Sequence, residues 1–209
     1  MRIRNVFIGL AFLNILSACA TLSEDQCAVQ DWRSVGLADG SSGQAASRLL
    51  QHREACIKYA IEIDGEAYRQ GYADGLRLYC TGPNGFEQGR RGAAYRNVCH
   101  GAPADDFHDG YRDGRKLYSM AANLNRLAGE ISSREHQLAT TEEDLKLAGL
   151  VLISADATGE ERKLALADTL TLAKERTQLQ EEIEQLVVEH TLHKREMAEF
   201  EAQLAWVGY

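Results

Sequence analysis

The sequence predicts an all-α protein in which a Gly-rich helical head, stapled by disulfides, precedes a long antiparallel helical hairpin. Three observations lead to this fold class. The chain has 209 residues but only 2 Pro, so it can form long uninterrupted helices. Of its 18 Gly, 13 lie between positions 36 and 114, where Gly and aromatic residues recur at helical spacing. A heptad pattern then occupies residues 117–209.

Residues 1–18 have the features of a secretory signal peptide. Arg2 and Arg4 supply the positive start, and an apolar run follows over residues 6–16. This run is shorter than the roughly 20 apolar residues that a membrane-spanning helix needs. We therefore expect removal of the segment on export rather than a transmembrane helix.

The end of this segment, Leu16-Ser17-Ala18-Cys19, resembles the bacterial lipobox. The resemblance implies that Cys19 is lipidated and becomes the first mature residue, followed by a short linker over residues 19–26. Ala20 after the cysteine implies transfer to the outer membrane. The membrane is thus an expected partner through the lipid anchor, and the chain is expected to face the periplasm.

Four further cysteines then lie in an oxidising compartment, where disulfides persist. They are Cys27, Cys56, Cys80 and Cys99. Four cysteines allow three pairings, and the sequence alone does not decide among them. We favour Cys27 with Cys56 and Cys80 with Cys99, because sequential pairing closes short loops and each bridge would contribute about 3 kcal/mol. A metal site is the alternative, although the chain has no C-x-x-C motif.

The head, residues 27–116, carries a degenerate repeat. Copies that begin at Tyr68 and Phe107 place an aromatic residue, Gly, Gly and Tyr on one helical stripe, and weaker copies begin at Phe86 and Trp32. A glycine inside a helix costs about 1 kcal/mol relative to alanine. We expect close contact between helices to offset that cost.

Three further local patterns in the head predict one more helix, one turn and the start of one helix. An amphipathic pattern over residues 41–63 predicts one more helix. Thr81-Gly-Pro-Asn-Gly85 is typical of a turn, and Asp105 is a plausible N-cap residue for the helix that contains Phe107.

The aromatic side chains of the stripe allow two interpretations. They could stack against glycan rings in an open groove, which would make peptidoglycan a partner, or they could form a packed helical core. Aromatic residues at helical spacing are usually core residues, so we favour the second interpretation. The candidate ligand stripe consists of Trp32, Tyr68, Tyr72, Tyr79 and Tyr111.

Several motifs of the head occur in a fixed order: Cys27…Asp31-Trp32…Gly36-Leu-Ala-Asp-Gly40, Tyr68…Gly71…Gly75-Leu…Tyr79-Cys80, and Asn84-Gly85…Gly89…Gly92…Tyr95…Cys99. This order resembles the domain of unknown function 2799 family of proteobacterial envelope lipoproteins, over roughly residues 19–118. The resemblance implies an outer-membrane or periplasmic lipoprotein. It implies no catalytic residues, because the family has none assigned.

The remaining residues, 117–209, form two heptad segments separated by a turn at residues 154–159. Leucine and isoleucine dominate the a positions, and Thr158 with Glu161 forms a capping box that starts the second helix. Folding at the turn makes an antiparallel hairpin, which would return Trp206 and Tyr209 to the head. The alternative is intermolecular pairing into a coiled-coil dimer, so the sequence leaves monomer and dimer open.

Polar residues interrupt the heptad seam at Arg134, Thr141, His190 and His193. Such residues commonly specify the register of a coiled coil. A metal or pH-sensitive site at His190 and His193 is the alternative, but it lacks a third inward-facing ligand. We therefore predict no metal and no other cofactor.

No catalytic motif emerges. The chain has no G-x-S-x-G, H-E-x-x-H or G-x-x-x-x-G-K-[ST]. A formal net charge of −8 argues against nucleic acid as a partner. The sequence therefore favours a non-catalytic structural or protein-interaction factor that uses the hairpin as its binding arm. The alternatives are a peptidoglycan-binding module and, with less support, a cell-wall hydrolase.

Overall fold

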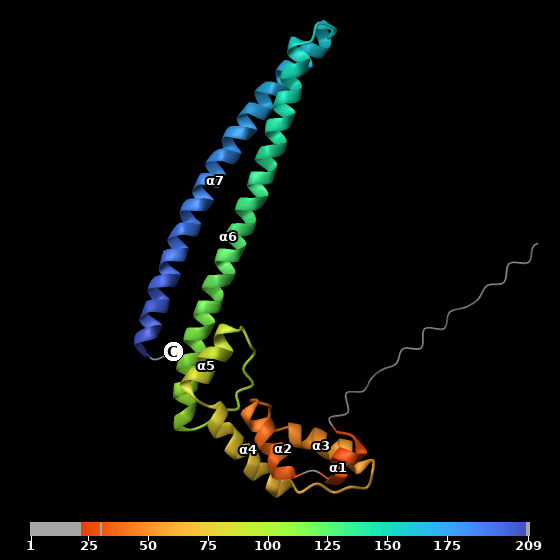
Figure 1. Cartoon of the computed structure of the whole chain (residues 1–209), viewed down its shortest axis with the longest axis vertical. Coiled ribbons are helices and arrows are strands. Elements are labelled where there is room, and N and C mark those ends of the chain that lie inside the picture. Colours follow the sequence, from red (N-terminus) through yellow and green to blue (C-terminus); the bar gives the residue numbers. More distant parts are fainter. Residues whose placement is uncertain (1–21, 30, 208–209) are drawn as a thin grey trace, which may run out of the picture. The chain divides into compact units, whose positions relative to one another are not determined.

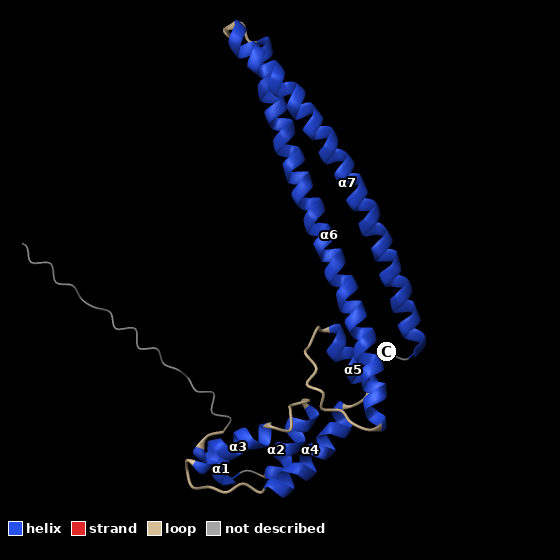
Figure 2. Ribbon diagram, turned by 180° about the vertical axis from the view of Figure 1, so that it is seen from behind, coloured by secondary structure: helices blue, strands red, loops and turns tan. Residues whose placement is uncertain are grey.

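The computed structural model describes residues 22–29 and 31–207, so the signal segment, Cys19 and Tyr209 lie outside the described residues. The described chain is all-α and contains no strand (Figures 1 and 2). It forms two compact units, which divide between Leu76 and Arg77. The helices are α1 (Glu24–Val29), α2 (Trp32–Ser41), α3 (Arg48–Ile57), α4 (Gly65–Tyr79), α5 (Gly82–Arg90), α6 (Ala102–Ile153) and α7 (Gly159–Val207).

In the first unit, α2 and α4 approach each other until their backbones touch at glycines. A Cβ atom at Gly36 would collide with the carbonyl oxygen of Tyr68, and one at Gly71 would collide with that of Arg33. The same contact recurs one turn further along each helix, at Gly40 and Gly75. The close approach that the glycine stripe predicts is therefore present, and it accounts for glycine at four helical positions.

In the second unit, α5 and α6 pack in the same way. A Cβ atom at Gly85 would collide with the carbonyl oxygen of Phe107, and one at Gly110 would collide with that of Gly82. Gly89 and Gly114 repeat the contact one turn along. The four stripes of the sequence thus combine as two helix pairs, one in each unit.

Each unit also holds one disulfide. Cys27 pairs with Cys56 in the first unit, and Cys80 pairs with Cys99 in the second. This is the sequential pairing that short loop closure favours. The first bridge is part of a small core with Trp32, Ile63 and Tyr68, so it connects α1 and α3 to the glycine-packed pair.

The second unit continues into an antiparallel hairpin of α6 and α7, as the heptads predict. The a and d positions of the two heptads are all buried or half-buried. On α6 they are Leu117, Met120, Leu124, Leu127, Ile131, Arg134, Leu138, Thr141, Leu145, Ala148 and Leu152, and on α7 they are Leu172, Leu179, Ile183, Leu186, His190, His193, Met197, Phe200 and Leu204. Leu127, Thr141 and Leu179 are among the most buried of them. Arg134 has a specific reason to interrupt the seam, because its Nε lies 2.7 Å from Glu182 Oε2 on the facing helix. This pairing supports the register interpretation of the polar positions.

The ends of the hairpin helices also follow the sequence. The helix α6 ends at Ile153 and α7 begins at Gly159, which leaves the predicted turn between them. Thr158 and Glu161 form the predicted capping box: the Thr158 N–H donates to Glu161 Oε2 at 2.7 Å, and the Glu161 N–H donates to Thr158 Oγ1 at 3.3 Å. The predicted border near residue 117 is not a break in structure, because α6 runs continuously through it.

Three predictions about helix ends in the head are wrong. The helix predicted over 41–63 spans only Arg48–Ile57, because α2 ends at Ser41 and Gly43 and Ala60 have positive φ angles. Thr81 does not open an isolated turn but is the N-cap of α5, with Pro83 in the first turn, where a missing N–H costs nothing. Likewise, α6 begins before Asp105, because Pro103 starts the helix after Gly101.

The expected docking of Trp206 on the head is also wrong, since its side chain is 93% exposed. The end of α7 instead packs through Leu204, Phe200 and Met197 against Phe86 and Leu117 of the second unit. These residues continue the heptad stripe, whereas Trp206 lies off it. None of the helices in the described part of the chain is long and apolar enough to cross a membrane.

The two tryptophans give a direct check of this arrangement. Trp32 is 7% exposed in the core of the first unit, whereas Trp206 is open to solvent. We expect Trp206→Phe to leave a blue-shifted emission spectrum that acrylamide quenches poorly. Strong quenching of the remaining Trp32 would contradict the closed core of the first unit.

Candidate functional site

The first unit contains a polar cluster in which His52 and Tyr68 are buried and Asp39 is half-buried. The Tyr68 hydroxyl donates to Asp39 Oδ2 at 2.8 Å, and His52 Nε2 lies 2.7 Å from the same oxygen. His52 is 3% exposed and Tyr68 is 1% exposed. One carboxylate oxygen thus connects α2, α3 and α4.

This cluster is suited to a structural role. A catalytic side chain must touch its substrate, and neither the His52 ring nor the Tyr68 phenol reaches the surface. Burial, followed by the hydrogen bond to Asp39, raises the pKa of Tyr68 well above its usual range. The phenol therefore stays protonated and acts as a hydrogen-bond donor, and the cluster holds three helices together.

The raised pKa of Tyr68 predicts a loss of stability at high pH. Since the folded pKa exceeds that of the unfolded chain, near 10, the phenol contributes fully below pH ~10 and loses its contribution as the pH rises further. Burial raises the pKa values of Tyr72 and Tyr79 in the same direction. We expect the free energy of unfolding to fall by roughly 1 kcal/mol per pH unit for each such phenol above pH ~10.

Denaturant midpoints between pH 8 and ~11, recorded with tyrosinate absorbance, measure this effect. Tyr68→Phe should make the alkaline decline shallower and cost about 1 kcal/mol at neutral pH, through the lost hydrogen bond to Asp39. Phenylalanine can occupy position 68, because Phe107 lies against Gly85 in the second unit as Tyr68 lies against Gly36 in the first. Titration of all eight tyrosines near pH ~10 in the folded chain would contradict this account.

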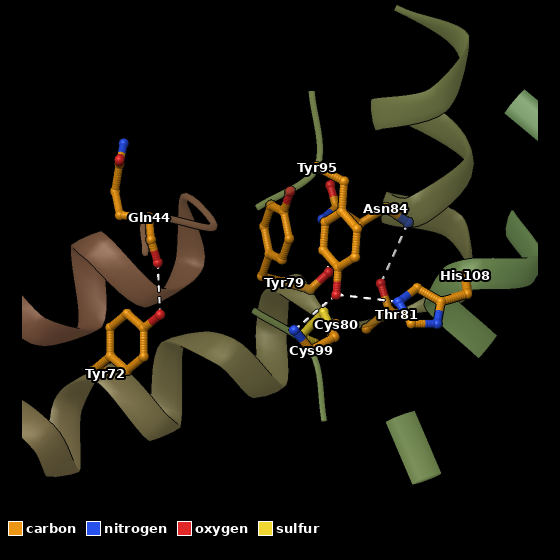
Figure 3. Close-up of a disulfide and its surroundings, with 9 residues drawn as sticks. All are labelled: Gln44, Tyr72, Tyr79, Cys80, Thr81, Asn84, Tyr95, Cys99 and His108. Atoms are coloured by element: carbon orange, nitrogen blue, oxygen red, sulfur yellow. Dashed lines mark hydrogen bonds between the residues drawn. A yellow bond between two sulfur atoms is a disulfide. The ribbon is translucent and has the colours of Figure 1, made fainter. Parts of the chain in front are cut away.

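The second unit has a different polar group beside its disulfide. The Cys99 backbone N–H donates to the Tyr95 hydroxyl at 2.9 Å, and His108 Nε2 lies 3.3 Å from the same oxygen (Figure 3). The Tyr95 ring packs on Phe107 with ring centroids 4.8 Å apart. These contacts anchor the loop between α5 and α6, and the Tyr95 side chain is half-buried.

Beyond their different polar groups, the two units share one plan in detail. In each unit a tyrosine on the second helix of the glycine-packed pair donates its hydroxyl to a backbone carbonyl in the loop that follows the first helix. Tyr72 donates to the Gln44 carbonyl at 2.6 Å (Figure 3), and Tyr111 donates to the Ala93 carbonyl at 2.7 Å. In both units the preceding glycine has a positive φ angle: 62° at Gly43 and 71° at Gly92. The two units therefore repeat one arrangement, a glycine-packed helix pair closed by a disulfide.

The residues of the candidate ligand stripe do not form an open stacking groove. Trp32, Tyr68 and Tyr79 are at most 7% exposed, in the cores of their own units. Tyr72 and Tyr111 are half-buried, and each stacks on its neighbour in the stripe with centroids 6.1 Å apart and planes 12° from parallel. These contacts agree with the packed-core interpretation, and Tyr72 and Tyr111 are the stripe residues that keep partial exposure.

Of the two seam histidines, His193 lies beside carboxylates of its own helix. His193 Nδ1 lies 3.0 Å from Glu196 Oε2, and its Nε2 lies 3.6 Å from Glu189 Oε1. His190 is half-buried in the seam. Within the part of the chain that the structure describes, no group of three or more His, Cys, Asp or Glu side chains is arranged to hold a metal ion.

The most distinctive surface lies where α6 and α7 meet the turn. Seven large apolar side chains are exposed there, and none occupies an a or d position of its helix. They are Leu147, Leu150, Val151, Ile153, Leu164, Leu166 and Leu170. Three of them, Leu147, Val151 and Leu164, line a groove of about 640 Å³ between the two helices, which we call the tip groove.

The heptad pattern does not predict the tip groove, although its residues carry a signal in the sequence. Leu147, Val151 and Leu164 are additional to the heptad, since none of them falls at an a or d position. Apolar residues on the outer face of a polar helix indicate a second contact surface. The Asp39 cluster carries no such signal, because His52 belongs to no recognisable motif.

Comparison with known proteins covers only the head. Residues 31–116 match the model of a family described as a protein of unknown function, DUF2799. The match begins at the N-cap of α2 and ends within α6 at Lys116, so it spans both glycine-packed pairs and stops before the arms of the hairpin. No curated protein and no solved structure matches the chain.

Proposed function

Because the matching family, DUF2799, has no known function, we propose a role from the architecture of the chain itself. The protein is a non-catalytic envelope lipoprotein that binds another protein through its helical hairpin. The observation that carries this proposal is the exposed apolar surface around the tip groove. The cores of the two units, in contrast, are closed around their aromatic residues.

The proposed location is the periplasmic face of the outer membrane. The signal-like start, the lipobox-like tetrapeptide and Ala20 support export and lipidation at Cys19. The two disulfides support the same compartment, because such bridges persist in oxidising environments and are rare in the cytosol. Lipid anchoring would fix one end of the chain at the membrane.

A binding role agrees with the chemistry of the described side chains better than catalysis does. In the Asp–His–Tyr cluster of the first unit the His52 and Tyr68 side chains are buried, and His108 of the second unit contacts the hydroxyl of a loop tyrosine, Tyr95. The tip groove is lined by leucine, valine, alanine, threonine and carboxylates, with no cysteine, histidine or serine that could act as a nucleophile or base partner. Its residues are suited to contact and not to bond making.

Lipidation at Cys19 is testable without reference to the partner. Cells that express the full chain are grown with an alkyne-tagged fatty acid, and the purified protein is examined for the tag. We expect the tag on the wild-type chain, in the outer-membrane fraction, and its loss in Cys19→Ala. An untagged wild-type chain in the soluble fraction would overturn the proposed anchor.

The partner-binding role is tested by affinity capture after crosslinking in intact cells. Leu147→Ser with Leu164→Ser removes two exposed apolar side chains of the tip groove and should abolish the captured partner. Val188→Ser with Leu192→Ser is the matched control, because these side chains are similarly exposed on α7 but lie outside the tip groove. Equal capture by all three proteins would refute binding through the tip.

A further inference from the structure

The tip groove has a definite shape, which follows from small residues in the heptad seam. Ala148 of α6 and Ala165 of α7 occupy seam positions near the turn, and Ala165 is 6% exposed. Alanine fills less space than the leucine and isoleucine found elsewhere in the seam, so the two alanines form a floor. Leu147, Val151 and Leu164 add exposed apolar side chains to the lining of the groove.

The rim of the tip groove is acidic. Asp144, Glu161 and Asp168 line it, and no lysine or arginine does. Glu161 is committed to the capping box, but Asp144 and Asp168 have no ion-pair partner among the described residues. The nearby Lys146 and Lys163 pair with other carboxylates, Glu143 and Glu160. The groove therefore presents two uncompensated negative charges beside an apolar floor.

The acidic charge of the tip groove favours some kinds of binding partner over others. A second copy of the chain would bring an identical acidic rim against this one, and like charges disfavour such a contact. An anionic lipid surface would be repelled for the same reason. A helix with an apolar face and basic flanks would fill the floor and neutralise the rim, which is how amphipathic helices bind hydrophobic grooves.

We infer that the tip groove binds an amphipathic helical segment of a partner protein, with leucine-like side chains on one face and lysine or arginine on its flanks. The inference rests on the proposed function and specifies the chemistry of the partner. Asp144 and Asp168 orient the segment and reject acidic competitors, while Leu147, Val151 and Leu164 supply the apolar contact. The groove lies outside the segment shared with the family.

A pair of synthetic peptides tests the inference on the full chain in zwitterionic nanodiscs. One peptide is built of Leu and Lys, with Leu at helical i, i+3, i+4 spacing, and the other has Glu in place of every Lys. Both carry a photoreactive group, and adducts are mapped by mass spectrometry. Mapping to individual residues separates binding in the groove from partition into lipid.

We expect the Lys peptide to label residues 144–172, and the Glu peptide to label them about tenfold less. Asp144→Lys with Asp168→Lys should reverse this preference. Glu135→Lys with Glu181→Lys is the matched control, because it adds the same charge at exposed positions of the hairpin outside the groove, and it should leave the preference unchanged.

Three results would overturn the inference: equal labelling by both peptides, labelling confined to other surfaces, or adducts between two copies of the chain at the groove. The outcome is separable from that of the proposed function. If cells show a partner that depends on Leu147 and Leu164 but the Lys peptide does not label the groove, the binding role stands and the basic-helix chemistry is wrong. If the peptide labels the groove and cells show no such partner, the proposed function fails.

Discussion

Gly71→Ala should lower the free energy of unfolding of the first unit by about 2 kcal/mol. The added methyl group would collide with the backbone carbonyl of Arg33, and backbone cannot move aside as a flexible side chain can. Overpacking a tight interface costs about 1–3 kcal/mol or more, while alanine recovers up to about 1 kcal/mol of helix propensity. The clash should dominate because four glycines of α2 and α4 share the contact and the helices cannot separate at one position alone.

Gly129→Ala is the matched control for this effect. Gly129 lies in the middle of α6, and an added methyl group would meet no other atom within 4 Å. The same substitution there should therefore stabilise the hairpin by about 0.5–1 kcal/mol. Trp32 emission in a Trp206→Phe background reports on the first unit, and circular dichroism reports on the hairpin. Similar stability changes for Gly71→Ala and Gly129→Ala would contradict backbone contact between α2 and α4.

Removing the first disulfide should have the largest effect on stability. Cys27 and Cys56 are 29 residues apart and Cys80 and Cys99 are 19 apart, so loop closure predicts that each bridge contributes about 3–4 kcal/mol. Cys27→Ser with Cys56→Ser should lower the stability of the first unit by this amount. The effect should be severe because that unit is small and Cys56 is fully buried in its core.

Urea unfolding followed by Trp32 emission measures the loss, and the wild-type chain with added reductant should approach the behaviour of the double variant. Cys80→Ser with Cys99→Ser serves as the comparison, because it should leave the Trp32 transition near its wild-type midpoint. An unchanged midpoint in the Cys27 and Cys56 variant would mean that the helix packing alone holds the first unit.

The sequence predicts those features of the fold that depend on a repeated residue spacing or on residues a few positions apart. The heptads of residues 117–209 predict the hairpin and its buried face, because antiparallel pairing over many turns depends on repeated spacing. The capping box of Thr158 and Glu161 needs only residues three positions apart, so it too is predictable. The disulfide pairing favoured by short loop closure is the one present, although the four cysteines allow two other pairings.

The exceptions have local or tertiary causes. The end of α2 at Ser41 depends on the positive φ of Gly43, whereas the amphipathic pattern places Gly43 inside the next helix. The size of Trp206 favours a core position, yet this residue lies off the stripe that Phe200 and Leu204 continue. The Asp39 cluster depends on three helices meeting, which no local pattern encodes. The tip groove escapes the heptad pattern because that pattern describes only the seam, and the exposed apolar residues of the groove lie outside it.

The central claim, that the tip of the hairpin contacts another protein, is tested most directly by site-specific photocrosslinking in intact cells. A photoreactive amino acid replaces Leu164 in the tip groove, Val188 on the same helix, or Leu50 on α3, all of which are exposed. We expect a discrete adduct with a second protein from position 164 and none from positions 188 and 50. Adducts of equal yield from all three positions, or none from position 164, would contradict the claim.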